Sequence, residues 1–133
     1  MNPACLMKVF QTGYQSMPPN NRYYIYVIRL DDSILRLKKF RDANPDYQKG
    51  KPCAYVGQTY KQPDIRFKEH ISGYRKDGKK RFSTKAKKYG KYLCRKQFKK
   101  ENEAGIYGRP NALKMEAKKA AELRAKGWAV WSK

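Results

Sequence analysis

The sequence has little of several residue types on which enzymes and secreted proteins often depend. Its cysteines, Cys5, Cys53 and Cys94, are three in number and widely spaced, which argues against a disulfide framework and a zinc site and predicts reduced structural thiols. There is a single histidine. No apolar run approaches the roughly 20 residues that span a bilayer, and the first ten residues lack a signal peptide's apolar core. We therefore expect a cytoplasmic protein without a membrane partner.

Negative charge is scarce as well. The 133 residues include 32 Lys and Arg but only 11 Asp and Glu, a formal net charge of +21. Such self-repulsion opposes a compact fold unless a polyanion neutralises it, so nucleic acid is favoured as partner over a membrane surface or a merely solvated surface. If the source is a prokaryote or a phage, we expect the protein to associate with the nucleoid.

The length and the pattern predict one α/β (α+β) domain at 22–133 after a loosely ordered N-terminal arm at 1–21. Runs rich in aromatic and β-branched residues predict strands, and capped segments with helical spacing predict helices. The expected strands are 22–30 and 53–57, the latter closed by Gly57. The expected helices are 31–45, 63–74 and 110–126.

The segment 75–100 contains thirteen Lys or Arg residues and one Asp. It predicts a short helix ending near Gly90, after which "YLCRKQF" fits either a strand or a second helix. Its aromatic residues would suit stacking on unpaired bases, although they more often anchor a basic face to a core. We expect the segment to bind the phosphate backbone of nucleic acid, as a phosphate track formed by Lys79, Lys80, Arg81, Lys85, Lys87, Lys88, Arg95 and Lys96.

Glu116 is the most unusual carboxylate. Helical spacing places it on the apolar stripe formed by Leu113, Ala117, Ala120 and Leu123, whereas Glu122 falls on the surface. A carboxylate on a buried face is costly unless it is paired or holds a cation. Two interpretations follow, an internal salt bridge and a metal ligand.

Arg66 and His70 lie one turn apart on the helix predicted after "YVGQT". They occupy a flank beside an apolar side formed by Phe67, Ile71 and Tyr74. Taken alone, such a pair is more often found on an ordinary surface. Its position directly after the second strand is what favours a functional role.

Four segments in order resemble the GIY-YIG nuclease superfamily: "YIYVI" at 24–28, "AYVGQT" at 54–59, "RFKEH" at 66–70 and "ALKMEAKKAAELRAKGWAVW" at 112–131. The resemblance covers roughly residues 22–131, nearly the whole chain, and depends on the order of the segments. It implies a three-stranded sheet flanked by helices, whose third strand we expect within 91–107.

By this resemblance Tyr26 matches the first half-motif, Tyr55 and Gly57 the second, and Glu116 the metal-binding glutamate. Arg66 and His70 match the arginine of the following helix and the His or Tyr one turn later. The chain departs from the family at Tyr24, where glycine is usual, at Val56, in the long separation of the half-motifs, and in having no asparagine after Glu116.

The resemblance implies a metal-dependent endonuclease that hydrolyses DNA with Mg²⁺ (or Mn²⁺) in a single-metal site. Arg66 would grip a phosphoryl oxygen, and Glu116 would hold the metal near the leaving oxygen. Tyr26, or a relay through Tyr55 and His70, would activate water, with positive charge nearby lowering the tyrosine pKa.

The substrate would be double-stranded or branched DNA, with RNA not excluded, and the protein a monomer or a homodimer. The alternatives are a non-catalytic basic nucleic-acid-binding protein on the same fold and a structural RNA-associated protein. The literal letters Gly105-Ile106-Tyr107 lie among glycines and before Pro110. We interpret them as a loop leading to the Glu116 helix, since such flanks do not suit a central strand.

Overall fold

The computed structural model describes residues 21–73 and 83–132, in which five strands form one mixed sheet. Strand β1 pairs antiparallel with β2 on one side and with β3 and β4 on the other, and β5 joins the outer edge of β2 in parallel. The expected α+β class is confirmed, but the sheet has five strands and not three. The strands are β1 (Arg22–Leu30), β2 (Cys53–Thr59), β3 (Gly90–Leu93), β4 (Ile106–Tyr107) and β5 (Ala129–Ser132).

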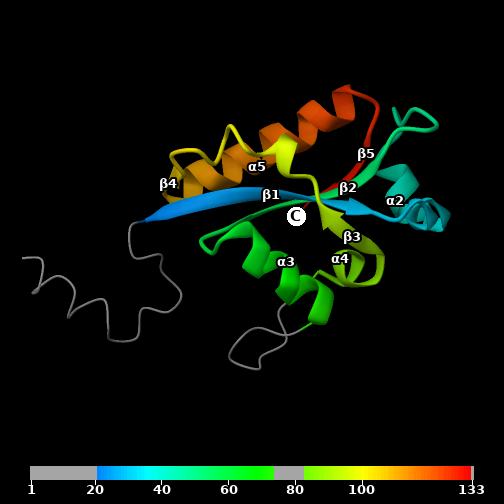
Figure 1. Ribbon diagram of the computed structural model, residues 1–133. Coiled ribbons are helices and arrows are strands. Elements are labelled where there is room, and N and C mark those ends of the chain that lie inside the picture. Colours follow the sequence, from blue (N-terminus) through cyan, green and yellow to red (C-terminus); the bar gives the residue numbers. More distant parts are fainter. Residues whose placement is uncertain (1–20, 74–82, 133) are drawn as a thin grey trace, which may run out of the picture.

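Helices cover both faces of the sheet: α5 runs along one face, and α3 and α4 lie on the other (Figure 1). The α-helices are α2 (Lys38–Asp42), α3 (Pro63–Ser72), α4 (Thr84–Tyr89) and α5 (Arg109–Ala125). Two short 3-10 helices, η1 (Asp32–Arg36) and η2 (Arg95–Gln97), complete the described elements. The predicted helices at 63–74 and 110–126 and the short one ending near Gly90 are therefore confirmed to within a few residues.

The continuous helix predicted at 31–45 is wrong, because the chain is extended at Leu37 between η1 and α2. Ile34 and Phe40 are both fully buried. Six residues apart, they would project from different sides of one α-helix. The break at Leu37 lets both side chains enter the core.

The strand predicted at 22–30 is confirmed as β1, and the one at 53–57 continues to Thr59, so Gly57 does not end it. The third strand sought within 91–107 is β3, which begins one residue earlier. "YLCRKQF" supplies the end of β3 and then η2. Both interpretations of that segment were thus partly right.

Strand β5 and the buried Asn44 fasten the C-terminal segment to the sheet. The Asn44 Oδ1 atom accepts hydrogen bonds from Val130 N at 2.7 Å and from Arg124 Nε at 3.1 Å. Its Nδ2 atom donates to Phe40 O at 2.8 Å. One amide therefore joins α2 to α5 and β5, which lie far along the chain from it.

The two cysteines in the described residues are free thiols: Cys53 is buried, as expected, and Cys94 is partly buried. Cys5 and the arm predicted at 1–21, except for Asn21, lie outside the described part of the chain. Among the helices that are described, none has both the length and the apolar character needed to cross a membrane.

Candidate active site

Tyr26 lies across Gly57 at the centre of the site. The two residues face each other in the β1–β2 register, and the Tyr26 side chain is only 2% exposed. A Cβ atom at position 57 would overlap the phenol ring and its hydroxyl group. Gly57 is thus required by the packing of Tyr26, not by the end of a strand.

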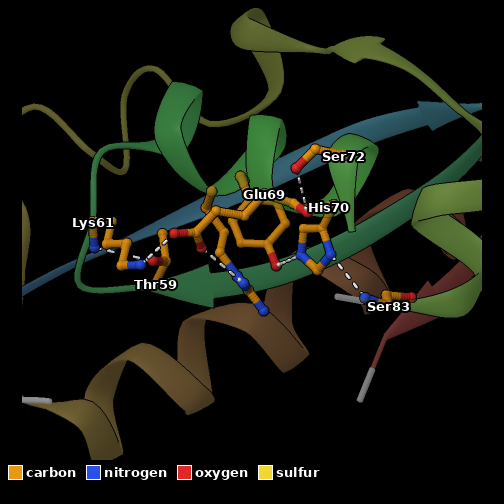
Figure 2. Close-up of polar contacts among 8 residues, drawn as sticks. Thr59, Lys61, Glu69, His70, Ser72 and Ser83 are labelled. Carbon is orange, nitrogen blue, oxygen red and sulfur yellow. Dashed lines mark hydrogen bonds and ion pairs between the residues drawn. The ribbon is translucent and has the colours of Figure 1, made fainter. Parts of the chain in front are cut away.

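His70, on α3, is 1% exposed and connects Tyr26 to the start of α4. Its Nε2 atom lies 2.9 Å from Tyr26 Oη, and its Nδ1 atom accepts a 2.8 Å hydrogen bond from Ser83 N (Figure 2). Since a backbone N–H can only donate, Nδ1 of the neutral ring carries no proton. Nε2–H therefore donates to the Tyr26 oxygen.

Tyr55, on β2, completes an aromatic group around the same point. Its ring stacks on that of Tyr26 with centroids 6.1 Å apart and an interplanar angle of 11°. The His70 ring lies 5.4 Å from the Tyr55 centroid and 5.7 Å from that of Tyr26. The structure thus brings three of the predicted catalytic residues into direct contact.

Arg66 is oriented by a carboxylate that the sequence analysis overlooked. Glu69, 4% exposed, accepts from Arg66 Nη1 at 3.0 Å through Oε1 and pairs with Lys61 Nζ through Oε2. Figure 2 shows this Lys61–Glu69 pair at one end of the group of polar contacts and the His70–Ser83 contact at the other. Two cations share one buried carboxylate, which leaves an excess positive charge beside the tyrosines.

Helix α3 buries mainly polar residues, although Phe67 of the predicted apolar side is partly buried against the core. Its buried residues are Pro63, Glu69 and His70, whereas Ile71 is 38% exposed. Tyr74 lies outside the described residues. The spacing of Arg66 and Glu69, three positions apart, is the signal that could have found the missed carboxylate.

Glu116, on α5, is 6% exposed, as its place on a buried face predicted. The face itself differs from the expected stripe, because Leu113 is 43% exposed and Ala117 is also exposed. The helix instead buries Lys119, whose ammonium group lies 2.5 Å from Glu101 and 3.0 Å from Glu122. Glu122 is on the surface, as expected. The residues that α5 buries are Ala112, Glu116, Lys119, Ala120 and Leu123.

Burial is the largest influence on the pKa of Tyr26 and holds it well above the ordinary tyrosine value, with Tyr55 adding to the effect. The charge of Arg66 and a hydrogen bond from it lower the pKa, but they are outweighed. Burial likewise raises the pKa of Tyr55, and Glu116 raises it further. Arg66 thus lowers the pKa of Tyr26 as expected, but burial outweighs this effect in the substrate-free protein.

The influence of both Arg66 and Glu116 on the two tyrosines is explained by the edge of β2. Helices α3 and α5 lie on opposite faces of the sheet (Figure 1). Strand β5 pairs only with Cys53–Val56, so the stretch from Gly57 to Thr59 has no strand on that outer side in the described residues. Side chains from the two helix layers can approach each other past such an edge.

The donor set suits a hydrated cation better than a tightly held one. Within residues 21–73 and 83–132 there is no group of three His, Cys, Asp or Glu residues that could hold a metal ion. Gln58 Oε1, on the α5 side of β2, is buried without a hydrogen-bond partner. A carboxylate and an amide oxygen in the layer between β2 and α5 match the preference of Mg²⁺ for oxygen ligands, with water and phosphate completing its shell.

The predicted phosphate track is only partly described. Lys79, Lys80 and Arg81 lie outside the described residues, whereas Lys87, Lys88 and Lys96 are exposed. Two other members have internal partners: Lys85 Nζ lies 3.9 Å from the centroid of the Trp131 ring, and Arg95 pairs with Asp64. Phe98 is core, whereas Tyr92 is 54% exposed.

The comparisons with known proteins add no identity to this geometry. No protein-family model, curated protein or solved structure matches the chain. The functional argument therefore depends on the arrangement of the side chains themselves.

Proposed function

We propose that the protein is a metal-dependent endonuclease that hydrolyses phosphodiester bonds in DNA. The observation that carries the proposal is the contact of Tyr26, Tyr55 and His70 across Gly57, with Arg66 acting on the same phenol. These are the residues that the resemblance to the GIY-YIG nucleases selects, although they come from three elements. A core that needed only apolar packing would not bury two phenols, an imidazole and paired charges together.

Arg66 binds a non-bridging oxygen of the scissile phosphate in this proposal. A guanidinium group offers planar donors that match a phosphoryl group, and Glu69 fixes its orientation from behind. Lys61 shares the same carboxylate and adds a second positive charge at a fixed place. The cluster prepares an anion site before the substrate arrives.

Glu116 is the residue that would hold Mg²⁺, with Gln58 Oε1 as a second oxygen in the same layer. A bound divalent ion supplies charge neutralisation at the leaving oxygen. With few protein ligands, affinity for the ion in the absence of substrate would be weak. Millimolar metal and bound DNA would be needed together.

In the reaction, water attacks the phosphorus, the P–O bond to the sugar oxygen breaks, and the leaving oxygen takes a proton from solvent. The phenolate form of Tyr26 accepts the proton of the attacking water. His70 favours that form because its Nε2–H donates to the phenol oxygen. His70 cannot itself accept the proton from Tyr26 while Ser83 N–H occupies Nδ1, so we assign it a positioning role.

The test is incubation of the purified protein with duplex, branched and single-stranded DNA in Mg²⁺ or Mn²⁺. We expect cleavage by the wild type, and its loss in Glu116→Ala and Arg66→Ala with DNA binding largely retained. Glu122→Ala and Lys68→Ala are the matched controls, because each removes an exposed charge of the same sign from the same helix. Absence of cleavage on every substrate would reject the nuclease.

A non-catalytic nucleic-acid-binding protein is the second candidate. The net charge of +21 and the high pKa of Tyr26 favour it, since the first suits any polyanion and the second disfavours a tyrosine base. On this alternative the four variants would differ only in DNA affinity. Glu116→Ala and Arg66→Ala would then have no effect beyond those of their controls.

A further inference from the structure

Tyr107 is the most exposed of the large apolar or aromatic side chains in the described residues, at 60%. It belongs to β4, whose two residues follow Gly105 in the literal Gly105-Ile106-Tyr107, so the loop predicted there from the sequence is wrong for Ile106 and Tyr107. The Arg22 guanidinium carbon lies 5.5 Å from the centroid of the Tyr107 ring. The pair forms an exposed surface with a π-face and a positive charge.

The backbone around Tyr107 holds this surface in place. Ile106 is 7% exposed and enters the core, so the alternation of a strand turns the next side chain outward. Gly105, at φ +75°, lies where a Cβ atom would come within 3.3 Å of the Arg22 side chain. Asn111 Nδ2 donates to Tyr107 O at 2.9 Å. The backbone that carries the exposed Tyr107 side chain is therefore held in place on both sides.

The sheet register places this surface on the same face as the candidate active site. Arg22 pairs with Tyr107 and Tyr26 pairs with Gly57, and residues two or four apart in a strand share a face. The separation of Arg22 from Tyr26, four residues along β1, is roughly 13 Å. A stacked nucleic-acid strand covers that distance in about four nucleotides, and an extended one in fewer.

We propose that Tyr107, backed by Arg22, is a stacking site for an unpaired base near the scissile phosphate. The inference builds on the proposed nuclease function and assigns the substrate class: nucleic acid with a single-stranded segment beside the cut. Stacking on an aromatic ring is available to every base, and Arg22 adds charge for the phosphate. Helix α5 begins at Arg109, one residue beyond its N-cap Gly108, without an acidic residue in its first turn, which also suits a phosphate.

The experiment measures DNA binding by fluorescence anisotropy in EDTA, so that no cleavage is needed. The probes are a labelled blunt duplex and the same duplex carrying a thymidine tail on either strand. We expect Tyr107→Ala to weaken the binding of at least one tailed duplex by about 5- to 150-fold, which is the range for one stacked base. The binding of the blunt duplex should weaken by less than about twofold. Tyr107→Phe keeps the ring and should keep the affinity.

Tyr92→Ala is the matched control. Tyr92 is 54% exposed on β3 but pairs with Arg29, whose position in β1 puts it on the opposite face. We expect this variant to bind both probes as the wild type does. An unchanged affinity in Tyr107→Ala, or an equal loss with blunt and tailed DNA, would overturn the proposal.

The stacking site and the nuclease can fail separately. A protein that binds tailed DNA through Tyr107 but cuts no substrate keeps the first and loses the second. If the wild type cuts DNA but Tyr107→Ala binds tailed DNA as well as the wild type does, the nuclease proposal stands and the stacking site is rejected. Because Tyr107 is exposed, the variants should unfold at the temperature of the wild type, which thermal denaturation checks.

Discussion

Two buried ion clusters on opposite sides of the sheet have inverse compositions. On α3 a carboxylate, Glu69, lies between two cations, Lys61 and Arg66. On α5 a cation, Lys119, lies between two carboxylates, Glu101 and Glu122. Each central group is almost inaccessible, with side-chain exposures of 4% and 7%. Both obey the rule that a buried charge needs partners.

The sign of the excess charge separates the two clusters. The α3 cluster is left with one extra positive charge and is close enough to Tyr26 for Arg66 to influence its pKa. The α5 cluster is left with one extra negative charge and ties the segment around Glu101 to the helix. The same arrangement thus leaves positive charge beside Tyr26 in one place, where we propose an anion site, and holds a loop against a helix in the other. Charged networks should be judged by their excess charge and neighbours, not by their number of ion pairs.

The largest expected effect comes from breaking the α3 cluster. Glu69→Gln frees Arg66 from its orientation, and we expect kcat for DNA cleavage to fall about 100- to 1000-fold, as for loss of one preorganised donor. Asp64→Asn is the control, because it removes another α3 carboxylate, one that pairs with Arg95 at the surface. Both variants gain the same charge and should bind DNA equally well, so a similar kcat in the two would refute the positioning role.

A pH–rate profile tests whether the excess positive charge of the α3 cluster can offset the burial of Tyr26. Since burial holds the Tyr26 pKa above its ordinary value, the phenol is neutral in the substrate-free protein at neutral pH. If the phenolate is the base, kcat/KM should rise about tenfold per pH unit up to at least about pH 10. A plateau near pH 8 would show that another group accepts the proton.

Breaking the α5 cluster should affect stability and leave activity alone. Lys119→Met leaves two carboxylates without their cationic partner, but Glu101 and Glu122 are 19% and 42% exposed and can be hydrated again. We therefore expect a loss of about 2 kcal/mol in the free energy of unfolding, below the range for fully buried pairs. Urea denaturation measures it, and the folded fraction should keep the wild-type kcat.

The stability difference between wild type and Lys119→Met should depend on pH. Burial opposes the charge on Glu101, yet the hydrogen bond from Lys119 prevails and holds the Glu101 pKa below its ordinary value. Burial also opposes the charge on Lys119, but the carboxylates hold its pKa above the usual lysine value. A lowered acid pKa stabilises above the unfolded value and is lost as the pH falls. The difference in unfolding free energy between the two proteins should persist from about pH 5 to 10 and become smaller below about pH 4. A difference that stays constant below about pH 4 would show that the carboxylates do not cause it.

Much of the fold was predictable because local signals agreed with the tertiary structure. Strand β1 and helices α3 and α5 have strong residue preferences and clear boundaries. Strand β5 was missed because a short apolar segment gains its partner, β2, only in the folded chain. The break at Leu37 was missed for a similar reason, since the need to bury both Ile34 and Phe40 cannot be seen from a helical pattern alone.

The burial of Glu116 was predictable because a carboxylate on an apolar helix face is unusual, whereas the sequence marked Gly57 only as a motif residue and a strand end, and its place opposite Tyr26 is known from the structure alone. Lys61 was missed because nothing local marks which of many charges becomes buried, and the spacing of Glu69 from Arg66 indicates an ion pair but not its burial. The face of α5 was misassigned for the same reason: an ion-paired Lys119 took the place that Leu113 was expected to occupy. Sequence periodicity identifies apolar faces, but it does not detect a charge that pairing has made acceptable inside.

The hydrogen bond between Asn44 and Val130 also affects when the sheet can be completed during folding. Its partners are 86 positions apart, and β5, which it fixes, covers the outer edge of β2. A growing chain cannot close that edge until residues near 130 have left the ribosome. Closing such a long loop slows folding because chain entropy is lost before the contacts form. The outer edge of β2 is therefore covered only after the other described strands have been translated.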